Sequence, residues 1–269
     1  MPRLREADAS RRLANGGPNY VEALARGLSV IGAFGQGRRQ LSLSDVARAT
    51  SLPKASVRRM LHTLITLQLA DTDGRVFRLT PRVLGLAGDY LGSNKVSTVV
   101  QPVCERISQA TGRSCYVAVL DGHDMVVIAH ALPHYPMELS PGVGLRHPAF
   151  CTAAGRAILG TFDEGVLDHW LSELKPRALT KFTPTSLKGI RKAILDARET
   201  GYGATHQDVK LGDCGLAVPV RRYDGRTVGA LHITGTVDDP PMRHLPRLKA
   251  AVDDLQKQLF WRGAAQALS

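Results

Sequence analysis

The sequence predicts an α+β protein with an N-terminal winged helix-turn-helix domain, a linker helix and a C-terminal domain of helices packed on an antiparallel sheet. Three observations predict this fold. Residues 44–67 have the pattern of two short helices joined by a tight turn. An Asp-Gly pair lies between short apolar runs within 69–79, as in a β-hairpin. After residue 95, helical patterns alternate with β-rich segments that turns connect.

Length and composition set the broad class. The chain has 269 residues, enough for two domains, and its 43% hydrophobic and 22% charged residues are ordinary for a globular protein. No apolar run reaches about 18 residues, so we expect no membrane span, and the N-terminus lacks a secretory-signal pattern. The four widely spaced cysteines include no CxxC pair. We therefore expect neither a zinc site nor a disulfide framework, and a cytoplasmic protein.

The charge of the chain favours a polyanionic partner. The net charge is +11, and residues 1–92 hold 14 Lys and Arg against 7 Asp and Glu. About a third of the chain thus carries most of the positive excess, which is typical of nucleic-acid binding. A solvated basic segment is the alternative.

The first predicted helix follows an arm. Residues 1–18 are polar and end in Asn-Gly-Gly-Pro, so we expect a flexible arm. A helix should begin near Tyr20 and end at the glycines of 35–37. Its apolar residues recur at helical spacing and are expected to bury one face; they are Val21, Leu24, Leu28, Ile31 and Phe34.

The helix-turn-helix follows. Ser44 is a candidate N-cap for the first short helix, whose small inner residues Val46, Ala47 and Ala49 suit a close helix crossing. Pro53 is placed where the second helix begins. The buried stripe of that helix is predicted to be Val57, Met60, Leu61, Leu64 and Ile65.

The opposite face of the second helix is basic, which predicts DNA contacts. Lys and Arg can bind phosphates, and Arg can bind guanine with two hydrogen bonds. An amphipathic helix with a solvated face is the alternative, but the Asp73-Gly74 hairpin directly after it has the position of a wing. The predicted DNA-binding residues are Ser44, Pro53, Lys54, Ala55, Ser56, Arg58, Arg59, His62, Arg75 and Arg78.

Beyond the wing, Thr80 and Pro81 are expected to cap a helix that is apolar on nearly every side. Such a helix needs a partner, so we interpret it as a linker that also dimerises. The expected boundaries are 1–18 for the arm, 19–80 for the winged domain, 81–94 for the linker and 95–269 for the second domain.

The second domain is predicted from its periodicity. Asp121 to Asp124 and Tyr223 to Gly225 are expected turns between paired strands. Ser186 is a helix N-cap and Gly201 a helix stop. The expected strands are 114–121, 125–131, 215–221 and 227–236, and the expected helices are 99–110, 151–159, 164–174, 186–199 and 247–259.

The order of these motifs over about 240 residues resembles the IclR family of bacterial transcriptional regulators. The matching segments are ARGLSVIGAF (25–34), FRLTPRVLGLAGDYL (77–91), VAVLDG (117–122), GLRHPAFCTAAGRAIL (144–159), GYGATHQDVKLGDCGLAVPV (201–220) and VGALHITG (228–235). Within the family, LSLSDVARAT and TDGRVFRLTPRVL are similar to the subgroup that controls aromatic-acid catabolism.

The resemblance implies a sequence-specific regulator that binds operator DNA as a homodimer or homotetramer. It also implies a GAF-like second domain that binds a small effector, often a carboxylate. The family pocket falls on Ala153, Ala154, Thr205, Asp213, Gly215, His232 and Thr234. The family pattern has Glu where Asp208 stands, Ser or Cys at Gly215, Ser at His232, and Gly at Ser51.

The residues themselves give partial support to this pocket. The small residues from Cys151 onward open a helix, whose free N–H groups attract carboxylates. Arg146 and His147 precede it and could pair with an anion. We therefore add Arg146 and Cys151 to the candidate effector residues; helix packing and a solvated Arg146 are the alternative.

Two other classes of function compete with a regulator. An enzyme could use Cys151 as a nucleophile with a histidine as base, but no pattern fixes their geometry. An architectural DNA-binding protein would need no ligand, and the long second domain argues against it. Gly142-Val143-Gly144 lacks the third glycine of a dinucleotide loop, and the histidines show no metal-ligand spacing. We expect no enzymatic activity, cofactor, metal or membrane partner.

Overall fold

The computed structural model describes residues 19–35, 38–86, 88, 95–133, 142–222 and 224–267. Two compact units divide the chain, Met1–Tyr90 and Leu91–Ser269. The expected arm at 1–18 lies outside the described residues, as does most of 87–94, so the linker boundaries stay predictions. Among the helices that the structure describes, none is long and apolar enough to span a membrane.

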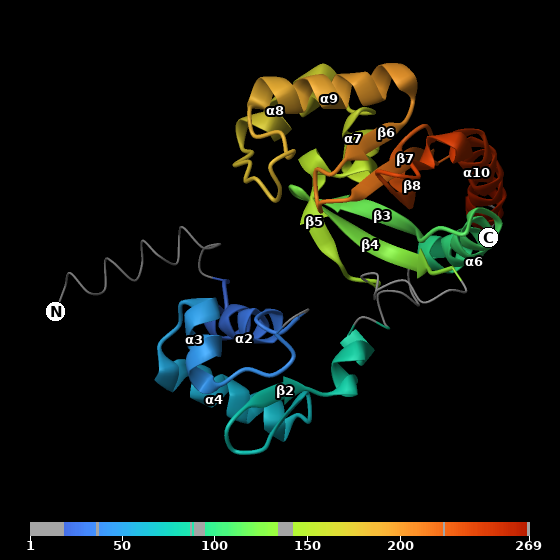
Figure 1. Cartoon of the computed structure of the whole chain (residues 1–269). Coiled ribbons are helices and arrows are strands. Elements are labelled where there is room, and N and C mark those ends of the chain that lie inside the picture. Colours follow the sequence, from blue (N-terminus) through green and yellow to red (C-terminus); the bar gives the residue numbers. More distant parts are fainter. Residues whose placement is uncertain are drawn as a thin grey trace. The chain divides into compact units, whose positions relative to one another are not determined.

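The first unit is a winged helix-turn-helix, as predicted (Figure 1). Its elements are α2 (Glu22–Gly32), α3 (Leu43–Thr50), α4 (Lys54–Thr66), β1 (Ala70–Thr72), β2 (Phe77–Leu79) and the 3-10 helix η1 (Pro81–Val83). β1 and β2 pair antiparallel around Gly74, whose positive φ of 90° suits glycine. The core of the unit consists of Val30, Ala33, Leu41, Val46, Ala47, Val57, Leu61, Leu64 and Ala70.

The turn between α3 and α4 is tight because Ser51 adopts a left-handed conformation, with φ 55° and ψ 28°. Its neighbour Leu52 donates its backbone N–H to the Ala47 carbonyl at 3.2 Å. Pro53 then precedes the first residue of α4. A left-handed backbone is unusual for serine, so this position carries some strain.

The N-cap of α3 is Ser42, and the prediction of Ser44 was wrong. The Ser42 hydroxyl accepts from the Asp45 N–H at 3.3 Å, and the Asp45 carboxylate accepts from the Ser42 N–H at 3.1 Å. This reciprocal capping box needs a carboxylate three residues after the cap. Ser42 has one in Asp45, whereas the residue three positions after Ser44 is Ala47. Ala49, predicted on the inner side, is exposed.

Loss of this cap should destabilise the first unit. We expect Ser42→Ala to lower the free energy of unfolding by about 1 kcal/mol, because one helix N–H then lacks a side-chain acceptor. Ser44→Ala is the matched control and should have little effect. Denaturant unfolding followed by circular dichroism measures both, and a larger loss for Ser44→Ala would contradict the assignment.

α2 buries only part of the predicted face, since Ile31 and Phe34 are partly buried against the core of the unit. Its buried residue is Val30, whereas Val21, Leu24 and Leu28 are 61%, 62% and 56% exposed. The apolar stripe is present, as predicted, but no described residue covers most of it. Periodicity shows that a helix has an apolar face and does not show what packs on it.

The second unit is built on one antiparallel sheet of six described strands in the order β5-β4-β3-β8-β7-β6. The strands are β3 (Cys115–Asp121), β4 (Asp124–Ala131), β5 (Arg146–Pro148), β6 (Gly203–His206), β7 (Asp213–Arg221) and β8 (Thr227–Thr236). The two predicted hairpins, β3–β4 and β7–β8, are confirmed. The two edge strands, β5 and β6, were not predicted, because they are short and lie in segments without alternation.

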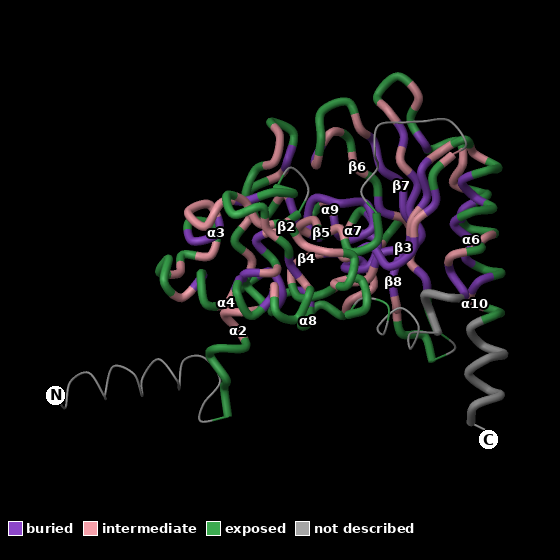
Figure 2. The backbone as a smooth tube through the Cα atoms, turned by 90° about the horizontal axis from the view of Figure 1, so that it is seen from below, coloured by how far each residue is buried: buried purple, intermediate pink, exposed green. Residues whose placement is uncertain are grey.

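Helices cover both faces of this sheet. They are α6 (Lys95–Thr111), η2 (Ala149–Cys151), α7 (Ala153–Leu159), α8 (Glu164–Ser172), α9 (Leu187–Thr200), η3 (Pro241–His244) and α10 (Leu245–Ala267). α6 and α10 pack on one face and α7 on the other (Figure 1). The central strands β3, β7 and β8 are buried between them (Figure 2).

Side-chain size differs between the two faces of the sheet. Val117, Leu216 and Leu231 point toward α6 and α10. An alanine adjacent to each of them on the same strand points toward α7 instead; these are Ala118, Ala217 and Ala230. On β6, Gly203 lies so close to α7 that an added Cβ would be 2.0 Å from the Ala153 oxygen. α7 therefore lies close against the sheet because the residues beneath it are small.

Candidate functional site

The outer face of α4 carries cations that the fold leaves unpaired. Lys54, Arg58 and Arg59 are exposed, and none of them has an ion-pair partner among the described residues. Ala55 and His62 are exposed on the same side of the helix, and Pro53 is exposed just before it. Val57, Leu61 and Leu64 are buried on the opposite side. The core thus fixes the helix while its basic face stays free.

Two predicted residues of the helix-turn-helix are less accessible. Ser56 is partly buried and, with Arg59, lines a groove beside α2. Ser44 is partly buried near the start of α3.

The wing presents one free and one paired arginine. Asp73 accepts the backbone N–H groups of Arg75 and Val76 at 2.8 and 2.9 Å, which holds the turn and lowers the pKa of Asp73. The Arg75 side chain has no ion-pair partner among described residues. Arg78 binds Asp71 at 2.5 Å across the hairpin and lowers the pKa of that carboxyl. Arg78 must therefore exchange or share this partner to contact a phosphate.

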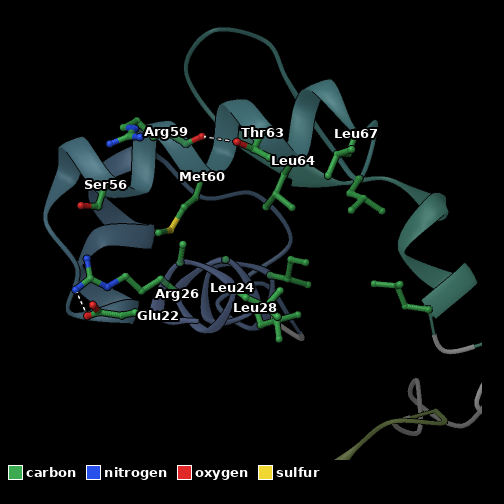
Figure 3. A pocket seen from close by; sticks show the side chains of 15 residues that line it. Glu22, Leu24, Arg26, Leu28, Ser56, Arg59, Met60, Thr63, Leu64 and Leu67 are labelled. Carbon is green, nitrogen blue, oxygen red and sulfur yellow. Dashed lines mark hydrogen bonds and ion pairs between the residues drawn. The ribbon is translucent and has the colours of Figure 1, made fainter. Parts of the chain in front are cut away.

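An apolar groove of about 670 Å³ lies between α2 and α4 (Figure 3). Leu24 and Leu28 of α2 form one wall, and Met60, Leu64 and Leu67 form the other. Leu86, which follows η1, also lines it and is 59% exposed. The groove is thus an exposed apolar surface within the winged unit, and such surfaces are candidate interaction sites.

A second cavity, of about 130 Å³, lies in the C-terminal unit on the α7 side of the sheet. Strand alternation places Tyr116, Gly215, His232 and Thr234 on the same face as the small residues under α7. The lining residues are Tyr116, Leu145, His147, Thr152, Ala153, Thr205, Asp208, Val209, Asp213, Cys214, Gly215, His232 and Thr234.

Six of the nine candidate effector residues line this cavity: Ala153, Thr205, Asp213, Gly215, His232 and Thr234. The other three do not. Arg146 pairs with Asp121 at 2.7 Å and Asp124 at 3.3 Å at the sheet edge, Cys151 is fully buried, and Ala154 packs in the core. Sequence reasoning missed the lining residues Tyr116, Leu145, Thr152, Val209 and Cys214. Residues two positions apart on a strand share a face, so Tyr116 could have been predicted to lie on the same face as Ala118.

One wall of the cavity depends on a buried ion pair. The Arg156 Nη2 donates to Asp208 Oδ2 at 2.6 Å, and both side chains are less than a tenth exposed. Arg156 also donates to the carbonyls of Phe150 and Ala204 at 3.0 and 2.9 Å. Asp208 Oδ1 accepts the His206 N–H at 2.7 Å. This network ties η2 and α7 to β6 and the segment after it.

The start of α7 is less open to an anion than predicted. The helix has seven residues, and the Thr152 hydroxyl already accepts the Gly155 N–H at 3.0 Å. Among the described residues that line the cavity, none is Lys or Arg. A ligand there would meet hydroxyl groups, imidazoles and carboxylates rather than a cation.

Cys151 has no features of a nucleophile. Its Sγ donates to the Pro148 carbonyl at 3.4 Å, and burial raises its pKa to about 12. A thiol with that pKa is protonated near neutral pH, and thiolate is the reactive form.

Together, the two units define a class of protein. A winged helix-turn-helix with free cations, joined to a domain that encloses a small cavity, defines a ligand-responsive DNA-binding regulator. Two protein-family models match the chain and identify its family. The IclR helix-turn-helix domain matches residues 23–74, and the C-terminal domain of the bacterial transcriptional regulator IclR matches residues 88–261. The chain belongs to the IclR family of bacterial transcriptional regulators.

Its relatives are regulators, not enzymes. The Pca regulon regulatory protein of Pseudomonas putida is 35% identical over 91% of this chain and 86% of its own length. The p-hydroxybenzoate hydroxylase transcriptional activator of Acinetobacter baylyi is 32% identical over 80% of this chain and 81% of its own. The predicted resemblance to the aromatic-acid subgroup is confirmed.

The fold is shared with solved structures. The crystal structure of a transcriptional regulator from Rhodococcus sp. RHA1 superimposes with a TM-score of 0.76 and 36% identity, covering 89% of this chain and 98% of that one.

Proposed function

We propose that the chain regulates transcription in the cytoplasm by binding an operator through α4 and the wing, under the control of a single-ring aromatic acid. The observation that carries the DNA interface is the set of exposed, unpaired cations on α4. Lys54, Arg58 and Arg59 are the proposed major-groove contacts, with Ala55, Ser56 and His62 beside them. Arg75, Arg78, Ser44 and Pro53 are proposed to contact the backbone.

The size of the cavity supports a one-ring effector. A cavity of about 150 Å³ can hold benzene. The cavity here, at about 130 Å³, has room for no more than one ring and must widen to admit its substituents. The names of the two relatives refer to p-hydroxybenzoate hydroxylase and to the Pca regulon, which agrees with an aromatic acid. Ala153, Thr205, Asp213, Gly215, His232 and Thr234 are the proposed contacts.

We infer that the chain binds its operator as a homodimer or as a homotetramer built from such dimers. The exposed leucines that line the groove, Leu24, Leu28, Leu67 and Leu86, support this inference, since burying them removes apolar surface from water. The partner is a second copy of the chain, because a palindromic operator requires two recognition helices related by two-fold symmetry.

The test uses the full chain. Selection from random DNA duplexes is expected to yield a palindromic operator, and sedimentation of the complex should give two or four chains per duplex. Addition of 4-hydroxybenzoate or 3,4-dihydroxybenzoate should then change the operator affinity. Equal affinity for all sequences would contradict the proposal. Specific binding that neither acid changes would favour the alternative of a DNA-binding protein without an effector.

A further inference from the structure

His232 is a buried ring that forms part of the cavity wall. It lies on β8, directly opposite Tyr116 on β3, and is 5% exposed. The two rings are stacked, with centroids 4.1 Å apart and planes inclined by 18°. Stacking on a neighbouring strand fixes the orientation of the imidazole.

Gly215 leaves the space that this ring occupies. A Cβ at position 215 would lie 2.7 Å from His232 Nε2 and 2.6 Å from Thr205 Oγ1, closer than real Cβ contacts allow. The backbone of Gly215 does not have a positive φ, so its conformation would accept any residue. The glycine is therefore required for space, and positions 215 and 232 share one volume on the cavity wall.

The ring has unused hydrogen-bonding capacity. Nδ1 of His232 is buried without a partner, and neither ring nitrogen makes a hydrogen bond to a described residue. A buried polar ring without a hydrogen-bond partner is costly. Nδ1 is closed off by the surrounding protein, whereas Nε2 lies beside Gly215 on the cavity wall, so Nε2 is the nitrogen to which a ligand or water would bond. Burial, with a smaller effect of His130, lowers the pKa of His232 to about 3, and the ring is uncharged near pH 7.

The rest of the cavity lining is also poor in positive charge. Asp208 is satisfied by Arg156, and Asp213 contributes a second carboxylate. Thr205 and Thr234 have hydroxyl groups with no side-chain hydrogen bond to a described residue. These groups suit a hydroxyl of the ligand rather than its carboxylate.

We propose that His232, in the space left by Gly215, selects hydroxylated aromatic effectors by hydrogen bonding to a ring hydroxyl. This inference rests on the proposed function, because it assigns the specificity of the same effector site. The preference is set by positions 215 and 232 together, since a side chain at 215 displaces the imidazole.

Calorimetric titration of the full chain with 4-hydroxybenzoate and with benzoate tests the proposal. The wild-type chain should bind 4-hydroxybenzoate about tenfold more tightly, as expected for one additional hydrogen bond. His232→Phe keeps an aromatic ring against Tyr116 but has no nitrogen, so the two affinities should become equal. His206→Phe is the control, since His206 is exposed and does not line the cavity.

A second pair of variants tests the shared volume independently. Gly215→Ser should weaken binding of both acids about tenfold or more, and His232→Ser in the same chain should restore binding of benzoate. Unchanged preference in His232→Phe, or wild-type binding by Gly215→Ser, would overturn the inference while leaving the proposed function intact. If neither acid binds to a wild-type chain that still recognises its operator, the inference and the proposed effector class both fail.

Discussion

Replacement of Arg156 by methionine is expected to lower the free energy of unfolding of the second unit by about 3–5 kcal/mol. Methionine fills much of the same volume but leaves the Asp208 carboxylate buried without its cation. The carbonyls of Phe150 and Ala204 lose their donors as well. A buried charge without a partner is among the most costly defects in a protein interior. Denaturant unfolding of the full chain measures the loss.

The control for this variant is Arg191→Met. Arg191 pairs with Asp168 at the surface, where solvent screens the interaction, so little change is expected. A double variant, Arg156→Met with Asp208→Leu, should be more stable than Arg156→Met alone, because no charge is then left unpaired. A loss below about 1 kcal/mol for Arg156→Met would show that the ion pair does not hold this part of the fold.

The second large effect is expected on operator binding. Arg58→Ala and Arg59→Ala should each weaken it, by about 1–3 kcal/mol for an arginine that contacts a base. Successive residues of a helix point about 100° apart, so the two arginines reach different parts of the groove. Arg59 is one of the residues that line the groove. Mobility shifts on operator and random duplexes separate the two roles.

Loss of a base contact reduces the difference between operator and random DNA, whereas loss of a phosphate contact weakens both equally. Arg106→Ala removes the same charge from exposed surface of the other unit and controls for net charge. Stability should be unchanged in all three variants, since none of these side chains is buried. Wild-type operator affinity in both α4 variants would exclude this face as the DNA contact.

Local patterns predicted the elements well. Ser186 and Gly201 delimit α9 as predicted, because a cap and a left-handed stop act within a few residues. The turn at Asp73-Gly74 and the strands beside it followed from residue type and alternation. The order of the motifs then identified the family. Each motif is weak by itself, but the whole set in a fixed order is specific.

Properties that depend on distant residues were not predictable in the same way. The exposed side of α2 depends on what packs against it, and its leucines look the same in sequence whether covered or not. Arg146 was expected at the effector cavity, but pairing with Asp121 and Asp124 holds it at the sheet edge. The Arg156–Asp208 pair joins residues 52 positions apart, and no local pattern indicates such a contact.

The unequal filling of the two sheet faces restricts how this domain can change over evolution. Val117, Leu216 and Leu231 face α6 and α10, where one aliphatic side chain can replace another of similar volume at small cost. Ala118, Ala217 and Ala230 face α7, and any enlargement there lifts a helix that forms one side of the cavity. Neutral substitutions should therefore accumulate on the face that packs against α6 and α10. Substitutions on the α7 face should instead accompany changes in the effector that the regulator binds.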